Sequence, residues 1–235
     1  MKPLTAVPSR TEQVYHAIRE SICDCSLEPG THLIQEDLAS MLGVSRQPIQ
    51  QAMLLLKNDG LVVEHGARGL YVAPIDRNQT VDRYQIRLML DKLSVRQVAA
   101  RARIDDSFRS QLRREGDAIL RSGKDALESG TAGDAVRHDV EFHSLFYNFS
   151  GNSMVFPTAE PHWFFLRRVM VAVLMHAERG PLVWEQHKEI LDAAISGDVE
   201  HVDQLASDHI TGAQTALFNA MENSQETSSY FAFRS

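Results

Sequence analysis

The segment Thr31–Val72 has the pattern of two short helices joined by a tight turn and followed by a β-hairpin. Leu38, Ala39 and Leu42 recur at helical spacing and predict an inward-facing side on the first helix. Gly43 allows the tight turn, because glycine adopts backbone angles that other residues avoid. This order is typical of a helix-turn-helix with a wing, in which the second helix enters the major groove of DNA.

The second helix of this pattern is expected to follow Ser45, whose side-chain oxygen can cap the first backbone N–H groups. Its apolar residues predict one buried face, formed by Ile49, Met53, Leu54 and Leu56. Polar residues near its start are expected to be exposed, and in this motif such residues meet base edges. The candidate DNA contacts on this helix are Ser45, Arg46, Gln47 and Gln50.

A wing is predicted directly after this helix. Short β-prone runs at 61–63 and 70–72 flank the glycine-rich sequence 65–69. Paired strands with such a tip can lay the loop along a phosphate or in the minor groove. The helices and the wing together favour a DNA-binding protein.

The overall charge of the chain does not favour nucleic acid. The chain has 24 Lys and Arg against 31 Asp and Glu, a formal net charge of -7. Contact with DNA must therefore rely on local positive groups and a defined docking surface, because the field of the whole molecule does not attract a polyanion.

Length and composition bound the domain count and the compartment. A chain of 235 residues is expected to form one or two domains. It shows no apolar leader and no run long enough to cross a bilayer. Cys23 and Cys25 would point about 200° apart on a helix, which is poor geometry for a disulfide. We expect a cytoplasmic protein with reduced thiols and no membrane partner.

The chain is predicted to contain a winged helix-turn-helix domain at 1–75 and an all-helical domain at 80–223, with a linker at 76–79 and a flexible tail at 224–235. Glycines such as Gly123 are expected to end the helices of the second domain. The fold class is therefore mainly α, with a small β-hairpin wing and a bundle of about six helices. Helical periodicity covers 80–103, 105–122, 134–149, 153–178, 181–196 and 199–222.

One group of side chains in the helical part suggests a metal site. Asp139 and His143 are four residues apart, so they lie about 40° apart on one helical face and can share a metal ion. His138 should point elsewhere, because it lies about 140° round the helix from His143. His187 and His209 fall on two later helices, each beside an apolar stripe. Three imidazoles and one carboxylate in a bundle core would suit Zn²⁺, Ni²⁺ or Mn²⁺.

The alternative is a chance pattern. The chain has 10 His, so an Asp/His pair at this spacing arises easily. A histidine on an apolar face is usually a hydrogen-bonded core residue rather than a ligand.

Both halves of the chain resemble a known family. The first half resembles the winged-helix domain of GntR-type bacterial transcription regulators, and the second resembles the ligand-sensing FCD domain of the fatty-acid-responsive branch. The motifs of the first half are LEPGTHL at 27–33, LGVSRQPI at 42–49, DGL at 59–61 and GARG at 66–69. Those of the second half are the Asp139/His143 pair, SGN at 150–152, Glu185-x-His187, ILxAAIxGD at 190–198 and HI at 209–210.

The resemblance implies a transcription regulator without catalytic activity. It implies a homodimer that binds a palindromic operator in double-stranded DNA, most often as a repressor, and responds to a small carboxylate or sugar acid. It implies that Arg87 faces the effector and pairs with its carboxylate, the alternative being an exposed salt bridge to Asp91. The metal ligands it implies are Asp139, His143, His187 and His209, and the wing contacts are His65, Gly66 and Arg68.

One position departs from the family pattern. Relatives usually carry Arg-Glu-Ala after the SRQPI segment, whereas this chain has Gln50 and Gln51 before Ala52. Gln50 can read adenine or touch backbone in place of the usual arginine. A helical metalloenzyme with an accessory winged domain is one competing function, but no convincing general base accompanies the candidate ligands and four protein ligands leave less room for chemistry. A protein-interaction module is the other, and Arg68 with the Ser45-Arg46 helix start favours DNA over it.

Overall fold

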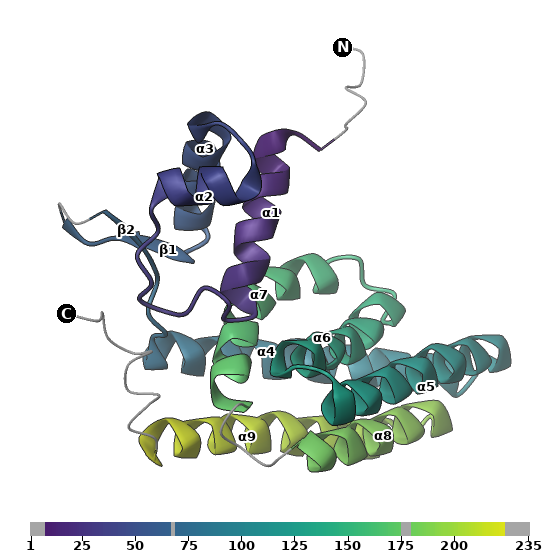
Figure 1. Ribbon diagram of the computed structural model, residues 1–235. Helices are drawn as coiled ribbons and strands as arrows, with labels where there is room; N and C mark the ends of the chain where they lie inside the picture. The colour runs from purple at the N-terminus through teal and green to yellow at the C-terminus, as the bar shows by residue number, and fades with distance from the viewer. Residues whose placement is uncertain (1–7, 67–68, 175–179, 224–235) are drawn as a thin grey trace, which may run out of the picture. The chain divides into compact units, whose positions relative to one another are not determined.

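The computed structural model describes residues 8–66, 69–174 and 180–223. The chain forms two compact units, one ending at Ile75 and the other beginning at Asp76 (Figure 1). Arg68, among the expected wing contacts, and the expected tail at 224–235 lie outside the described residues.

The first unit is a three-helix winged fold. Its helices are α1 (Arg10–Cys23), α2 (Gln35–Leu42) and α3 (Arg46–Asn58). Strands β1 (Val62–Glu64) and β2 (Leu70–Val72) pair antiparallel with Val62 opposite Val72. The segment before α2 adds to the outer side of β2, because Leu33 N–H donates to the Leu70 carbonyl at 2.8 Å. The wing is therefore tied back to the helices at its base.

Local residues explain the helix ends in this unit. Ser9 and Glu12 form a capping box that starts α1. Gly43 ends α2 with φ of 63°, the left-handed conformation that permits the tight turn. Ser45 is the N-cap of α3 by its backbone, but its side chain makes no capping hydrogen bond, so the predicted side-chain cap is wrong.

Two leucines differ from the predicted core. Leu54 is 62% exposed and Leu42 is 37% exposed. The buried face of α3 instead follows Ile49, Met53 and Leu56 at helical spacing, and Leu54 falls beside this face rather than on it.

The second unit is an all-helical bundle. Its helices are α4 (Arg77–Ala102), α5 (Asp106–Ser129), α6 (Ala132–Phe149), α7 (Val155–Leu174), α8 (Gly180–Ser196) and α9 (Val199–Asn223). Helix α4 packs along α9, α5 packs along α6, and α8 packs against both α5 and α9. The predicted fold class, mainly α with a winged hairpin and about six bundle helices, is confirmed over the described residues.

Two helix boundaries differ from the expected ones. Helix α4 begins at Arg77, within the expected linker, because the Asp76 side chain accepts the Gln79 N–H and caps it. Helix α5 runs through Gly123 to Ser129, although Gly123 was predicted to end it. A Cβ atom at Gly123 would lie 2.0 Å from the ring of Trp184, so this glycine allows close packing of α8 rather than a helix stop.

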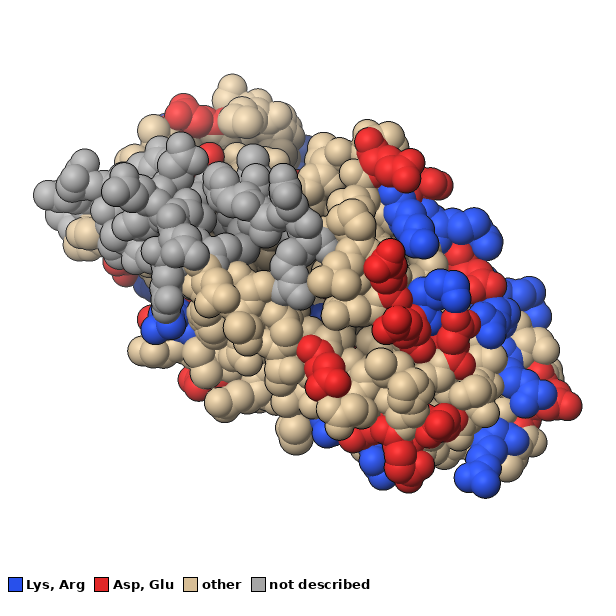
Figure 2. Space-filling view, turned by 90° about the horizontal axis from the view of Figure 1, so that it is seen from below, with Lys and Arg blue, Asp and Glu red and all other residues tan. Residues whose placement is uncertain are grey.

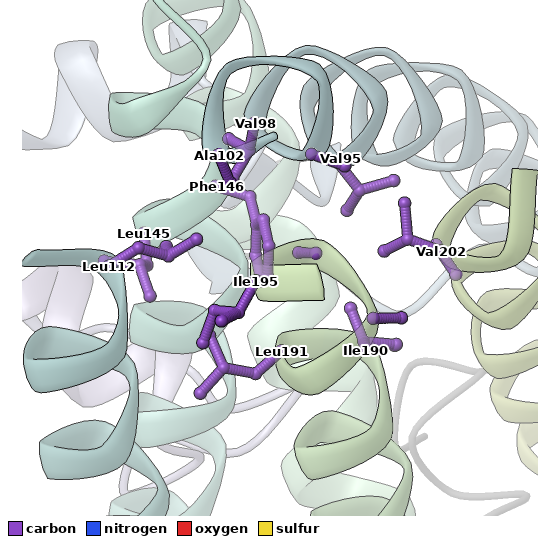
Figure 3. Packing of buried hydrophobic residues seen from close by; sticks show 14 of the residues in the cluster. Val95, Val98, Ala102, Leu112, Leu145, Phe146, Ile190, Leu191, Ile195 and Val202 are labelled. Atoms are coloured by element: carbon purple, nitrogen blue, oxygen red, sulfur yellow. The ribbon is translucent and has the colours of Figure 1, made fainter. Parts of the chain in front are cut away.

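The bundle core lies between these helices. Phe146 of α6 meets Val98 of α4 and Ile195 of α8 there, with Leu112 of α5 on one side (Figure 3). Phe142 and Trp184 belong to the same cluster. Their rings pack against His187, Phe142 stacked at 4.1 Å and Trp184 edge-on at 4.9 Å between ring centroids. The apolar core thus fixes the orientation of a buried imidazole.

The surface of the helical unit is mixed in charge. On the face shown in Figure 2, Lys and Arg side chains are interspersed with Asp and Glu rather than gathered by sign. Ion pairs such as Arg113–Asp192 at 2.6 Å and Lys92–Asp203 at 3.1 Å match this pattern. Among the described helices, none combines the length and the apolar character needed to cross a membrane.

Candidate functional site

Four buried polar side chains meet inside the helical unit. Asp139 and His143 come from successive turns of α6, His187 comes from α8 and His209 from α9. Each is at most 5% exposed. One potential ligand atom from each lies within 4.8 Å of all the others. These are the four residues that the sequence singled out as candidate ligands.

The spacing of the ligand atoms fits a metal ion. Nε2 of His187 lies 3.2 Å from Nε2 of His209 and 3.3 Å from Oδ1 of Asp139. Two ligands at tetrahedral angles on a metal, each about 2.0–2.1 Å away, are separated by about 3.3 Å. Oδ2 of Asp139 has no hydrogen-bond partner among the described residues. A buried carboxylate oxygen without a partner is costly, so it also fits a cation.

Hydrogen bonds on the far side of two rings orient them toward this centre. Nδ1 of His143 is hydrogen-bonded to the Asp91 carboxylate, and Nδ1 of His209 to Oε1 of Gln186 at 3.0 Å. Metal-binding histidines almost always have such a partner, which fixes the tautomer and turns the other nitrogen to the metal. Tyr147 also donates to Asp91 at 2.7 Å and so holds the carboxylate in place.

Burial sets the protonation of the cluster. Burial lowers the pKa of His187 well below its ordinary value, so its imidazole is neutral as a ligand must be. Burial raises the pKa of Asp139 despite the opposing effect of His143 and Arg87. At Asp91 burial also works against the charged form, but His143 and Arg87 outweigh it and the pKa is lowered. Asp91 is therefore a fixed negative charge behind His143.

Arg87 lies at the edge of the same cluster. It is 3% exposed, and its Nη2 donates to Nε2 of His143 at 2.7 Å, the nitrogen that a metal would take, so metal binding would displace this contact. Its guanidinium is 3.8 Å from the carboxylates of both Asp91 and Asp139. The face of Trp163 supports it, with the guanidinium carbon 4.2 Å from a ring centroid. The expected salt bridge to Asp91 therefore exists, but it is buried rather than on an exposed face.

A cavity of about 180 Å³ opens beside this cluster. Arg87, Asp139 and His209 line it together with side chains from α5, α7 and α8. A small molecule in the cavity would touch the candidate metal site directly.

Asp91 offers a test of this arrangement. Asp91→Asn keeps the shape of the side chain but removes the carboxylate that accepts from His143. We expect metal affinity to fall about 10–100-fold, the usual effect of losing such a partner. A competition titration with a chromophoric chelator measures it. The surface carboxylate Asp192, which pairs with Arg113, provides the control Asp192→Asn, and equal affinities in the two variants would disprove the role of Asp91.

The winged unit holds the candidate DNA contacts. Ser45, Arg46, Gln47 and Gln50 are exposed at the start of α3, and Gly66 is exposed at the wing tip, where His65 is half-buried. Arg46 pairs with Glu36 of α2 at 3.0 Å. The Thr11 hydroxyl donates to Oε1 of Gln51 at 2.6 Å, so the side chain of the neighbouring Gln50 is more available than that of Gln51 for a contact with DNA.

Sequence reasoning missed three members of the site. Asp91 was expected only as a surface salt-bridge partner of Arg87, and Tyr147 and Gln186 were not predicted to belong to the site. The only signal was spacing, since Tyr147 follows His143 by four residues and Asp91 follows Arg87 by four. Gln186 carried no periodic signal.

Comparison with known proteins matches both units. Residues 10–72 match the bacterial regulatory proteins of the gntR family, and residues 82–212 match the FCD domain. The chain is 26% identical to the HTH-type transcriptional repressor RspR of Escherichia coli over 94% of this chain and 93% of that protein. It is 30% identical to an HTH-type transcriptional regulator of the unstable DNA locus of Streptomyces ambofaciens, over 79% of this chain and 75% of that protein.

Solved structures share the fold. A GntR transcriptional regulator from Rhodococcus sp. RHA1 superposes with a TM-score of 0.77 at 22% identity, covering 91% of this chain and 99% of that one. E. coli McbR/YncC does so with a TM-score of 0.75 at 20% identity and the same coverage. The two domain families and the names of the curated relatives favour a regulator over the metalloenzyme alternative, as predicted. The chain belongs to the GntR family of bacterial regulatory proteins, as a DNA-binding transcriptional regulator with an FCD effector-binding domain.

Proposed function

We propose that this regulator is a homodimeric repressor that binds a palindromic operator and releases it when a small organic acid, a carboxylate or a sugar acid, enters the helical unit. The observation that carries the proposal is the buried cluster of Asp139, His143, His187 and His209 with a cavity beside it. The name of one relative, a transcriptional repressor, supports the direction of control.

The four clustered residues would hold a divalent transition metal, Zn²⁺, Ni²⁺ or Mn²⁺. When bound, the metal supplies a Lewis-acidic contact for an effector oxygen. Arg87 supplies a second, cationic contact, because its guanidinium can pair with a carboxylate through two N–H groups. Phe142 and Trp184 hold His187 in place from the apolar side. The acid would then bridge helices α4, α6, α8 and α9, and their packing would depend on its presence.

The DNA contacts proposed are the start of α3 and the wing. Arg46 is the main base reader, because an arginine at the start of a recognition helix can bind guanine bidentately. Ser45 carries no capping hydrogen bond, which leaves its hydroxyl available to a phosphate. Gln47, Gln50, His65 and Gly66 are proposed contacts, together with Arg68.

Gln50 sets the operator preference in this proposal. Gln50→Arg adds one positive charge at an exposed position on α3. We expect tighter operator binding and a steeper salt dependence, by about one phosphate contact, or a shift of preference from adenine to guanine at one base pair. Fluorescence anisotropy at several salt concentrations measures this. If affinity, salt slope and preference all stay the same, Gln50 is not at the DNA.

The proposed dimer is supported by an apolar stripe on α4. Ile86, Met89 and Leu93 recur at helical spacing and are 41%, 59% and 40% exposed. Exposed apolar side chains that share one face mark an interaction surface, and a palindromic operator requires a second copy of the chain.

Met89→Lys tests this surface. A charge in the centre of the stripe should weaken self-association at least tenfold, because burying an unpaired ammonium is costly. Sedimentation velocity at several concentrations reports the change. Ile104→Lys is the matched control, since Ile104 is 85% exposed and lies outside the stripe. A dimer that is equally stable in both variants would place the interface elsewhere.

The direct test of the regulator itself uses the DNA upstream of its own coding sequence. Purified protein should prefer that duplex over a scrambled one at moderate salt, and a metal-loaded sample should release it when the effector is added. Equal affinity for the two duplexes would contradict the proposal.

A further inference from the structure

We propose that the effector is a small monocarboxylic acid with an apolar body of about five or six carbons, rather than a sugar acid, a dicarboxylic acid or a long-chain fatty acid. The inference rests on the proposed function, because it identifies the class of acid that fills the cavity beside the metal cluster.

One end of the cavity is prepared for a single carboxylate. Arg87 is buried and lines the cavity, and its Nη1 has no hydrogen-bond partner among the described residues. A buried guanidinium N–H without a partner is costly unless a ligand completes it. The rings of Trp163 and Tyr84 pack on the guanidinium and help to orient it, with their centroids 4.2 and 5.6 Å from its carbon.

Most of the other described residues that line the cavity are apolar. Thr131 is one of the few polar residues that line it, and its hydroxyl is already committed to the capping box with Asp134. The hydroxyl groups of a sugar acid would lose water there and find few partners, which costs binding free energy for each group. An alkyl or aryl body makes no hydrogen bonds to water, so it loses none when it enters the cavity. The apolar residues that line the cavity are Ala126, Leu127, Ala132, Ala135, Met170, Val183, Trp184, Ala213, Ala216 and Leu217.

The size of the cavity limits the length of the acid. Its volume is about 180 Å³. An apolar cavity of roughly 150 Å³ in another protein encloses one benzene molecule. A benzoate or a hexanoate therefore fits, whereas a fatty acid of sixteen carbons does not.

The charge of the site also selects a monoacid. The cluster holds one cation, Arg87, and two carboxylates, Asp91 and Asp139. A bound divalent metal changes the sum from minus one to plus one, with the histidines neutral as ligands. One carboxylate then neutralises the site. A second carboxylate would leave an unpaired buried negative charge, which is strongly disfavoured.

The test is isothermal titration of the metal-loaded, full-length protein with a matched panel of acids: acetate, butyrate, hexanoate, benzoate, gluconate, adipate and palmitate. We expect affinity to rise about fourfold per methylene from acetate to hexanoate, as each CH₂ is buried. Hexanoate and benzoate should bind at least tenfold tighter than gluconate and adipate. Tighter binding of gluconate, adipate or palmitate overturns the inference but leaves the proposed function intact. If no acid binds, both fail.

Two variants locate the binding. Ala213→Leu adds three carbons inside the cavity and should weaken hexanoate binding at least tenfold while metal content stays unchanged. Ala118→Leu, at an exposed position of α5, is the matched control and should bind like the parent protein. Arg87→Gln removes the cation that pairs with the carboxylate. Hexanoate should therefore bind this variant no more tightly than hexanol, its uncharged analogue. Undiminished hexanoate binding by Ala213→Leu would place the acid elsewhere and overturn the inference.

Discussion

His143→Ala should abolish the metal-dependent stabilisation of the protein. The substitution removes one of four clustered ligands and leaves Asp91 and Arg87 without the ring that is hydrogen-bonded to both. The loss of metal affinity should exceed the about 10–100-fold that outer partners contribute. With metal at one hundred times its Kd, the parent protein gains about 2.7 kcal/mol. For a domain of this size that corresponds to a rise in Tm of about 5–10 °C. Differential scanning calorimetry with and without metal measures it.

The control for this prediction lies on the same helix. His138 points away from the cluster and pairs with Glu141 at 2.7 Å. His138→Ala should keep the full metal-induced rise in Tm, because it removes an imidazole without touching the cluster. A variant of His143 that retains stoichiometric metal and the same rise in Tm would show that the cluster is a hydrogen-bonded core rather than a metal site.

Arg46→Ala should cause the largest loss of operator affinity among single substitutions in the winged unit. Its side chain is 67% exposed at the start of α3 and is held by Glu36 only through a surface ion pair. Surface pairs contribute about 0–1 kcal/mol, so DNA can displace Glu36 at little cost. A bidentate contact with guanine is worth about 1–3 kcal/mol, a loss of about 5- to 150-fold for each half-site, and a dimer on a palindromic operator loses two such contacts. Anisotropy against the operator and a duplex with that base pair changed measures both affinity and preference.

Two further variants sharpen this result. Lys57→Ala removes a charge near the other end of α3, where Lys57 pairs with Glu64 at 2.8 Å, and should change affinity much less. Glu36→Gln should tighten binding slightly, because it removes the anion that competes with DNA for Arg46. Equal losses for Arg46→Ala and Lys57→Ala would mean that α3 contributes general charge rather than base recognition.

The helical periodicity of apolar residues was the feature of the sequence that predicted most of this fold. Apolar spacing located most helix ends to within a few residues, because burial of one face follows the helical repeat, but α5 continues to Ser129, beyond its expected end at 122. It could not place Leu54, which falls beside the buried face of α3, or recognise that Gly123 admits Trp184 instead of ending α5. Both depend on which neighbour packs against a helix, and local pattern does not contain that information.

The candidate site, too, could be predicted only in part from the sequence. Asp139 and His143 could be paired from spacing, because residues four apart share a helical face. Their meeting with His187 and His209 depended on how three helices pack, so the apolar stripes beside those histidines could only suggest it and the family resemblance added support. Asp91 and Gln186 could not be predicted, since each contacts its histidine across more than twenty residues of sequence.

Operator affinity of the metal-loaded protein, measured with and without the acid that binds most tightly, shows whether the acid controls DNA binding. Coupling between two sites is typically about 5- to 150-fold. We predict that saturating acid weakens operator binding at least tenfold in the parent protein and leaves it unchanged in Arg87→Gln. Operator affinity that stays constant in the parent protein while calorimetry shows the acid bound would contradict the account.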